Sequence, residues 1–309
     1  MKIQTMSIVI GTQACNARCP FCVSGMTTKE ENIIKKVETI NSRNFKIALE
    51  LANIGDVTTL LFTGKGEPTL YPTHLTDCLS EVLTQEHKNK WFFPLKELQT
   101  NAITIHDNYN VIDKNDHLTM KERLELWYDY GLTTICISMV HYDQEKNRQI
   151  YLPHKEKYID LEKTIDYIHN AGLNVRLTCV GLNNHIDTVE EVENLLAFSK
   201  KNGVEQTSLT PVTSPTSSES KEIFNWTSKN YMKPEKIVSI QKWLTQNHTL
   251  IKKLAHDAKV YDINGQNFGF KNCLTIDPED EKYDYRQIIF FPNTGKIMHD
   301  WQYQGAQLL

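Results

Sequence analysis

Short apolar segments rich in β-branched residues alternate along most of the chain with longer segments in which apolar residues recur every three or four positions. The first pattern is typical of buried strands in a parallel sheet, and the second of helices that pack against a sheet. Six strands are predicted, at residues 5–11, 58–63, 92–99, 133–138, 175–180 and 206–211. Five helices are predicted between them, at residues 42–54, 72–84, 120–130, 159–171 and 188–202.

This alternation predicts an α/β fold built from repeated βα units. Six units are fewer than a closed eightfold barrel needs, so we expect a partial (β/α)6 TIM-type barrel with one open side, through which a large substrate could enter.

The last third of the chain reads differently. Residues 213–220 are rich in Ser, Thr and Pro, which indicates a linker. A C-terminal α+β extension is predicted beyond it, with a helix at 234–247 and a hairpin of strands at 287–291 and 296–301. The predicted division is therefore a barrel at residues 1–212 and a linker with a capping extension at residues 213–309.

The composition limits the partners and the location. The chain has 309 residues, 40% of them hydrophobic, so a sizeable core can form. Its 34 basic and 38 acidic residues give a net charge of −4, which disfavours large nucleic acids as partners. The apolar run at residues 6–10 is too short for a signal peptide or a membrane span. We therefore expect a cytoplasmic protein that does not bind membranes.

Three of the seven cysteines lie together directly after the first predicted strand. Cys15, Cys19 and Cys22 are spaced by four and then three residues, so one loop can bring three thiolates to one inorganic centre. Three thiolates suit a four-iron cluster, because the missing fourth cysteine leaves one iron open. A structural zinc site is the alternative, although it usually has four protein ligands.

The spacing of these cysteines, with Phe21 just before the last one, resembles the radical S-adenosylmethionine superfamily. The resemblance implies a [4Fe-4S] cluster held by Cys15, Cys19 and Cys22. It further implies that the open iron binds the methionine part of S-adenosyl-L-methionine. One electron, from a donor such as flavodoxin or ferredoxin, then cleaves the sulfonium to a 5′-deoxyadenosyl radical.

Within the superfamily, the branch of the molybdenum-cofactor cyclase is the most similar. The resemblance rests on the segments that follow Ser138 and Val175. The second set of cluster cysteines typical of that branch is absent here, so cyclisation of GTP is not expected.

The same resemblance assigns cofactor contacts to residues at the carboxyl ends of later strands. These candidates are Gly64, Lys65, Gly66, Glu67, Asn101, Ser138, Arg176, Pro211 and Val212. The segment 63–68 resembles a glycine-rich motif that receives the methionine amino group, with Lys65 in place of a second glycine. Asn101 and Ser138 resemble residues that line the cofactor cavity, and the backbone at Pro211 and Val212 resembles a segment that meets the adenine. For the polar residues, a role as helix cap or turn is the alternative.

Arg176 stands inside an otherwise apolar strand, and an unpaired buried charge is costly. We expect it to point into the barrel and hold the methionine carboxylate or a substrate anion. The alternative is a solvated position at the barrel rim.

The other cysteines divide into two groups. Cys78, Cys136 and Cys179 fall in predicted helices or strands and are interpreted as small core residues. Cys273 lies in a region of mixed polarity, where it is a candidate hydrogen-atom donor to a substrate radical.

Three functions follow as hypotheses. The first is an enzyme that abstracts hydrogen from a small polar metabolite or nucleotide. The second is radical modification of a ribosomally made peptide. The third, from another class, is a non-catalytic protein that kept the cysteine loop as a metal site.

Overall fold

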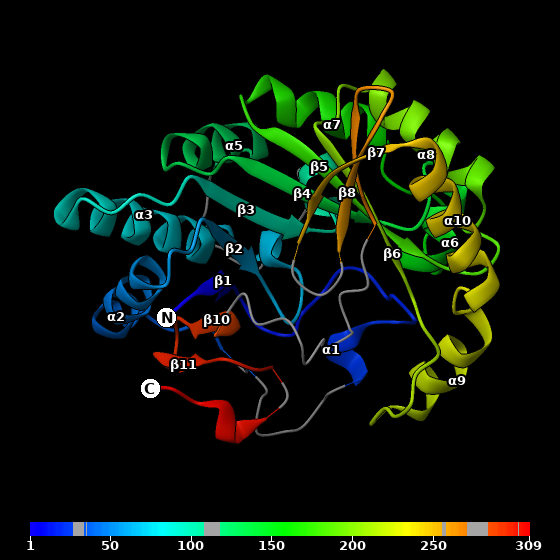
Figure 1. Cartoon of the computed structure of the whole chain (residues 1–309). Coiled ribbons are helices and arrows are strands. Elements are labelled where there is room, and N and C mark those ends of the chain that lie inside the picture. Colours follow the sequence, from blue (N-terminus) through cyan, green and yellow to red (C-terminus); the bar gives the residue numbers. More distant parts are fainter. Residues whose placement is uncertain (27–33, 35, 108–117, 255–257, 271–283, 302) are drawn as a thin grey trace.

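The computed structural model describes residues 1–26, 34, 36–107, 118–254, 258–270, 284–301 and 303–309. Within them, all the strands join one sheet in the order β11-β10-β1-β2-β3-β4-β5-β6-β9-β8-β7 (Figure 1). The sheet curves without closing, because its edge strands β11 and β7 do not pair with each other. The predicted open, partial barrel is therefore confirmed.

Six parallel strands form the centre of this sheet, and each overlaps one of the predicted strands. They are β1 (Ile3–Val9), β2 (Thr59–Thr63), β3 (Leu95–Thr100), β4 (Thr134–Met139), β5 (Asn174–Gly181) and β6 (Gln206–Pro211). Since they are parallel, their carboxyl ends meet at the same edge of the sheet.

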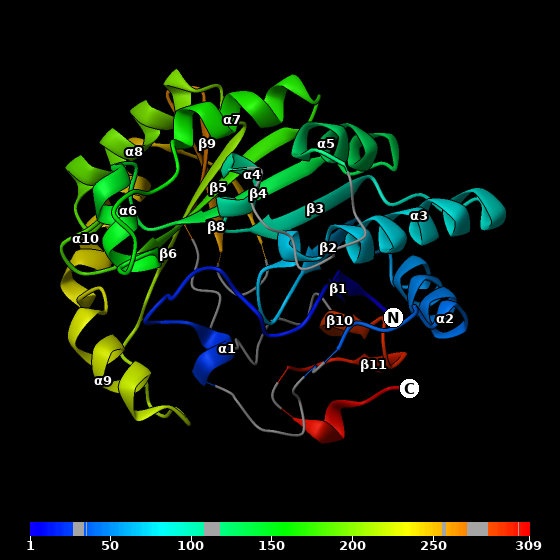
Figure 2. The same ribbon diagram turned by 180° about the vertical axis from the view of Figure 1, so that it is seen from behind.

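Helices between the strands cover the outer face of the barrel (Figures 1 and 2). The five predicted helices correspond to α2 (Ser42–Ile54), α3 (Pro72–Asn89), α5 (Met120–Asp129), α7 (Leu161–Asn170) and α8 (Val189–Lys201). Shorter elements were not predicted: α1 (Val23–Met26), the 3₁₀ turn η2 (Pro68–Leu70), α4 (Ile103–Asp107) and α6 (Gln144–Tyr151). The largest buried side chains, including Trp127, Phe45 and Phe62, lie in one main core.

The C-terminal part extends the barrel sheet at both edges. Helices α9 (Lys221–Asn230) and α10 (Pro234–Asn247) lead into β7 (Thr249–Lys253), β8 (Lys259–Ile263) and β9 (Gln266–Phe270). The predicted hairpin is present as β10 (Tyr285–Phe291) and β11 (Lys296–Met298), followed by the 3₁₀ turn η3 (Gln304–Ala306). Strand β9 pairs in parallel with β6, and β10 pairs in parallel with β1.

The two faces of the central strands differ in chemistry. Along β5, Val175, Leu177 and Cys179 are buried under the helices, while Arg176 and Thr178 alternate with them and face the barrel interior. The interior is thus polar and partly reached by solvent. Among the described residues, none of the helices combines the length and the apolar composition that crossing a bilayer requires.

Candidate active site

The cysteine loop follows β1 at the carboxyl edge of the sheet. Within it, the Cys22 amide donates to the Cys19 carbonyl at 3.1 Å, and helix α1 begins at the next residue. The Arg18 amide donates to the Tyr151 carbonyl at 2.9 Å, which ties the loop to the end of α6. Cys15, Cys19 and Cys22 are free thiols and are at least partly exposed to solvent.

The three thiols are close enough to affect one another's ionisation. Burial raises the pKa of Cys15 to about 11, and the carboxylate of Glu67 and the thiol of Cys22 add to the increase. Burial also raises the pKa of Cys19 well above its usual value, and Cys15 and Cys22 raise it further. Burial and the neighbouring groups thus disfavour ionisation of Cys15 and Cys19, and holding them as thiolates requires a cation or an iron centre beside them. The donor set of three cysteines fits an iron–sulfur cluster.

A single metal ion would need closer ligands. Within the described parts of the chain, no three His, Cys, Asp or Glu side chains are grouped tightly enough to share one ion. A cubane cluster differs because each cysteine binds a different iron, so its three thiolates stand further apart.

The glycine-containing loop after β2 packs directly against the cysteine loop. The Glu67 amide donates to the Ala14 carbonyl at 2.9 Å. A Cβ atom at Gly66 would lie 2.2 Å from the Ala14 oxygen and 2.7 Å from the Thr12 oxygen, so only glycine fits there. Burial lowers the pKa of the half-buried Lys65 ammonium.

The Glu67 carboxylate is 3% exposed and links this loop to the end of β3. Its Oε1 accepts from the Thr69 amide at 3.1 Å, the Thr69 hydroxyl at 2.7 Å and the Thr100 hydroxyl at 2.6 Å. Its Oε2 accepts from the Asn101 amide at 2.9 Å. Burial raises the pKa of this carboxyl, and the four donors oppose the increase. The side chain predicted to contact the cofactor therefore also holds two loops together.

Asn101 lies beside the first cysteine. Its Nδ2 donates to Asn16 Oδ1 at 2.7 Å and lies 3.8 Å from Cys15 Sγ, a hydrogen bond to sulfur. Asn16 in turn donates to the Thr104 hydroxyl at 3.1 Å. Donors to cluster sulfurs tune the reduction potential, so Asn101 is placed to act on the metal centre through Cys15.

Arg176 faces the barrel interior, as expected, but it is paired. Its Nη1 donates to Glu97 Oε2 at 2.8 Å, across the intervening strand β4. Its Nε is buried and has no hydrogen-bond partner among the residues that the structure describes. Gln99 Nε2 donates to the other Glu97 oxygen at 3.3 Å, and Gln206 is the neighbour of Arg176 in register on β6. We call Glu97, Gln99, Arg176 and Gln206 the inward row.

Ser138 lies at a higher level of the barrel than the inward row. It is the fifth residue of β4, whereas Cys136, which pairs with Arg176, is the third. Two residues of a strand span about 7 Å. Ser138 is thus near the level of Asn101 and the cysteine loop, whereas Arg176 lies about 7 Å deeper.

The backbone of Val212 is already engaged. Its amide donates to the Gly181 carbonyl and its carbonyl accepts from the Met232 amide, both at 2.9 Å. The Val212 amide is therefore not available to an adenine. The adenine could bond only to the backbone of Pro211, or to the Val212 carbonyl as a second donor. Cys273 lies outside the described residues. Cys78, Cys136 and Cys179 are buried, as interpreted from the sequence.

Glu97 and Asn16 were not predicted from the sequence. Glu97 had the same signal as Arg176, since it is a charge inside a predicted strand. Asn16 had no signal of its own, because its role depends on its contact with Asn101, which is 85 residues away in sequence.

The open parallel barrel and the loop of three free thiols at its carboxyl edge define an iron–sulfur enzyme of the barrel class. Residues 9–199 match the model of the Radical SAM superfamily, and the chain belongs to that family. It is therefore an enzyme that uses a [4Fe-4S] cluster and S-adenosyl-L-methionine. The non-catalytic hypothesis is not retained, and the resemblance to the molybdenum-cofactor-cyclase branch stays a prediction.

Known proteins similar to this chain differ in their substrates. A probable dual-specificity RNA methyltransferase RlmN from Chlorobium phaeobacteroides is 24% identical over 204 residues, which are 63% of this chain and 50% of that protein. SuiB of Streptococcus suis, solved with the precursor peptide SuiA, has a TM-score of 0.59 at 15% identity and aligns over 99% of this chain and 61% of its own. anSMEcpe with bound AdoMet and a Cp18Cys peptide has a TM-score of 0.52 at 16% identity, over 78% of this chain and 58% of its own. The chain thus spans about half to three-fifths of these relatives.

Proposed function

We propose that this enzyme cleaves S-adenosyl-L-methionine at the cysteine loop and directs the 5′-deoxyadenosyl radical at a small polar metabolite or nucleotide inside the barrel. The observation that carries the proposal is the inward row, a set of polar side chains below the level of the cysteine loop. An apolar barrel interior would have no means of holding a polar molecule there.

Cys15, Cys19 and Cys22 are the proposed cluster ligands. Cys15, Cys19 and Cys22 would hold a [4Fe-4S] cluster, which, once reduced by an external donor, would supply the one electron needed to split S-adenosyl-L-methionine into methionine and a 5′-deoxyadenosyl radical. Asn101 donates to the Cys15 sulfur and holds Asn16, so it fixes the loop and tunes the centre.

The residues at the carboxyl edge are the proposed contacts for S-adenosyl-L-methionine. The backbone at Gly64 to Gly66 lies against the cysteine loop, which supports contact with the methionine amino group. Ser138 lies near the level of Asn101, which supports contact with the ribose or the methionine carboxylate. Pro211 remains the candidate for the adenine.

Arg176 is assigned to the substrate and not to the methionine carboxylate. It lies about 7 Å below the level of Ser138, too deep for a cofactor held at the strand ends. With one nitrogen on Glu97 and Nε unpaired, its guanidinium can still receive an anionic or carbonyl oxygen. Glu97 can accept from an amine or hydroxyl of the same molecule.

Modification of a ribosomally made peptide is the second candidate. The open side of the sheet would admit a chain, and two similar structures contain peptides. RNA is suggested as a substrate only by the name of the RlmN relative, and the net charge of −4 does not favour binding to RNA.

The proposal is tested by anaerobic reconstitution with iron and sulfide, followed by dithionite and S-adenosyl-L-methionine, with 5′-deoxyadenosine measured by mass spectrometry. Cys19→Ala should lose iron and activity, while Cys78→Ala, which removes a thiol outside the loop, should retain both. A full four-iron signal in Cys19→Ala would contradict the ligand assignment.

The substrate class is tested by adding the low-molecular-mass fraction of a cell extract, or its peptide fraction, to the reconstituted enzyme. We expect the first to increase 5′-deoxyadenosine formation over the rate without substrate. The double variant Glu97→Gln/Arg176→Gln removes both charges of the pair and leaves neither one unpaired. It should lose this stimulation and keep the basal rate. Stimulation by the peptide fraction alone would favour the second candidate.

A further inference from the structure

The cysteine loop has an exposed outer side that carries positive charge. Arg18, between the first two cysteines, is exposed, and its amide is bonded to the Tyr151 carbonyl at the end of α6. The segment 153–157 follows at once and is also exposed; it contains Lys155 and Lys157. Figures 1 and 2 agree in showing α6 next to the N-terminal loop after β1. We call Arg18, Lys155 and Lys157 the basic rim.

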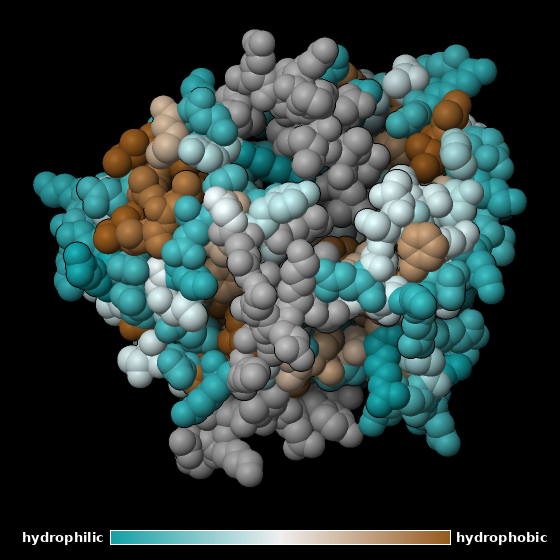
Figure 3. Space-filling view, turned by 90° about the horizontal axis from the view of Figure 1, so that it is seen from below, coloured by the Kyte–Doolittle hydropathy of each residue, from teal (hydrophilic) through white to brown (hydrophobic). Residues whose placement is uncertain are grey.

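The described part of the chain offers the cations of the basic rim no ion-pair partner. Arg18, Lys155 and Lys157 form no ion pair with any described residue. Glu156 is the one acidic residue within the segment 153–157. In the view from below, hydrophilic residues predominate over the described surface, with a smaller hydrophobic area at the left (Figure 3).

The segment that carries the two lysines is held in place. Arg148 donates through Nη1 to the Lys155 carbonyl at 2.7 Å, while its Nε and Nη2 donate to Glu145 at 2.7 and 2.6 Å. The rings of Phe21 and Tyr151 meet edge to face with centroids 6.3 Å apart, which holds the end of α6, just before this segment, against the cysteine loop.

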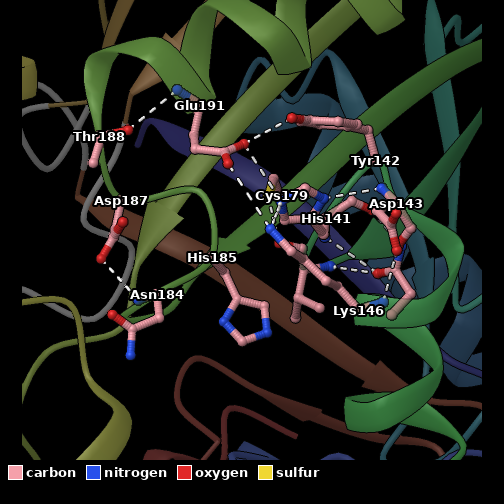
Figure 4. A network of polar contacts seen from close by, with 12 residues as sticks. His141, Tyr142, Asp143, Lys146, Cys179, Asn184, His185, Asp187, Thr188 and Glu191 are labelled. Atoms are coloured by element: carbon pink, nitrogen blue, oxygen red, sulfur yellow. Dashed lines mark hydrogen bonds and ion pairs between the residues drawn. The ribbon is translucent and has the colours of Figure 1, made fainter.

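The start of α6 is fixed as well, by the polar network of Figure 4. Asp143 caps the helix by accepting from the Lys146 amide at 3.0 Å, and its own amide donates to His141 Nδ1 at 2.9 Å. Tyr142 donates to Glu191 of α8 at 2.8 Å. The basic rim is thus a preformed surface beside the loop of the cluster ligands.

The proposed function requires that one electron enter the cluster from outside the chain. The electron carrier must therefore approach the surface nearest the cysteine loop. The whole chain has a net charge of −4, so an acidic carrier would be repelled in general and attracted only where cations are concentrated. The inward row serves a different side of the loop, inside the barrel.

From this arrangement we infer that the basic rim is the docking surface for an acidic one-electron carrier protein. On docking, the carrier loses one electron and the cluster gains it. The inference rests on the proposed function, because it assumes a cluster held by Cys15, Cys19 and Cys22. The lysines act by attracting and orienting the carrier, so their effect is on association and not on the chemistry that follows.

The test compares two reductants for the same enzyme: reduced flavodoxin, which is acidic, and dithionite, which needs no docking surface. The variant is Lys155→Glu/Lys157→Glu. The matched control is Lys46→Glu/Lys88→Glu, which changes the net charge equally at exposed positions of α2 and α3, across the molecule from α6 (Figure 1). The readouts are 5′-deoxyadenosine formation and the Kd for flavodoxin by titration calorimetry, both at low and high ionic strength.

At low ionic strength, the rim variant should lose about tenfold in flavodoxin-driven rate and in affinity, since steering by a charged surface changes association rates by about 10-fold to 1,000-fold. The difference should shrink in high salt. Its dithionite-driven rate should stay within about twofold of the original protein, and the control should do so with both reductants.

Equal effects of the rim variant and the control on flavodoxin binding would overturn the inference. So would a loss that is the same with both reductants, because that would indicate damage to the cysteine loop. If the rim variant weakened binding of an RNA hairpin and left flavodoxin-driven turnover unchanged, the rim would serve nucleic acid instead. Absence of 5′-deoxyadenosine from the original protein with dithionite would count against the proposed function itself, whereas flavodoxin affinity tests the docking surface separately.

Discussion

Replacing Glu67 by Gln removes one charge and almost no volume from the joint between the β2 and β3 loops. Each carboxylate oxygen accepts from one backbone amide, Thr69 on Oε1 and Asn101 on Oε2. A backbone amide can only donate, and so can the NH₂ group of glutamine. Whichever way the new side chain is turned, one backbone amide faces an NH₂ group and loses its acceptor.

The cost can be worked out from these contacts. A buried donor left without a partner costs about 1–3 kcal/mol. The remaining hydrogen bonds change from charge-assisted to neutral, which makes them roughly half as strong. Part of this loss in stability is offset, because the neutral glutamine avoids the unfavourable desolvation of a buried carboxylate. We therefore expect Glu67→Gln to lower the free energy of unfolding by about 3 kcal/mol.

The assay is urea unfolding of the iron-free protein, followed by circular dichroism. The matched control is Glu50→Gln on the exposed face of α2, which removes the same charge and should change the free energy by less than about 0.5 kcal/mol. An unchanged or increased stability of Glu67→Gln would refute the reasoning. It would mean that the carboxyl is protonated in the folded protein, with the threonine hydroxyls turned to accept from it.

Three further predictions concern the same region. Gly66→Ala places a Cβ atom 2.2 Å from a carbonyl oxygen of the cysteine loop. It should therefore lower the free energy of unfolding by about 3 kcal/mol and reduce the iron content after reconstitution. The control Gly305→Ala, with open space around the new Cβ atom, should change neither. Asn101→Leu removes the hydrogen-bond donor to Cys15 and should lower the cluster's reduction potential, because such donors stabilise the more negative reduced state. The potential is measured in a redox titration followed by electron paramagnetic resonance. An unchanged or higher potential contradicts this role of Asn101. His74 of α3 accepts from the Gly11 amide, at the start of the cysteine loop, through Nδ1. Burial lowers the pKa of His74 to about 4, below its unfolded value of about 6.5, so its contribution to stability is present above pH 6.5 and is lost as the pH falls towards 4. Urea unfolding should show a loss of about 2 kcal/mol between pH 7 and pH 5 from this residue, and His74→Gln should lose that part of the pH dependence; equal slopes would exclude it.

The central sheet was predictable from the sequence because each central strand carries β-branched and other apolar residues on the face that packs against the helices. Helix α6 was not, since apolar residues are nearly absent from Gln144–Tyr151 before its last two positions. The Asp143 cap is local in sequence, but the position of α6 also depends on contacts with α8 and the cysteine loop, which are not. Glu97 was overlooked although it is, like Arg176, a charge inside a predicted strand; only the pairing of the two, 79 residues apart, lay beyond a local reading of the sequence.

The role of the C-terminal segment follows from which strand it pairs with. Strand β10 is parallel to β1 and in register with it from Ile3 to Ile8, and Val9 packs with Ile289 and Met298 in a small core of its own. Without β10, β1 would become an edge strand with apolar side chains open to solvent. Because β1 carries the cysteine loop at its carboxyl end, the order of the cluster ligands depends on a strand that pairs with β1 from far along the chain, Tyr285 lying opposite Ile3. The segment predicted as a cap therefore also completes the sheet that supports the proposed cluster site.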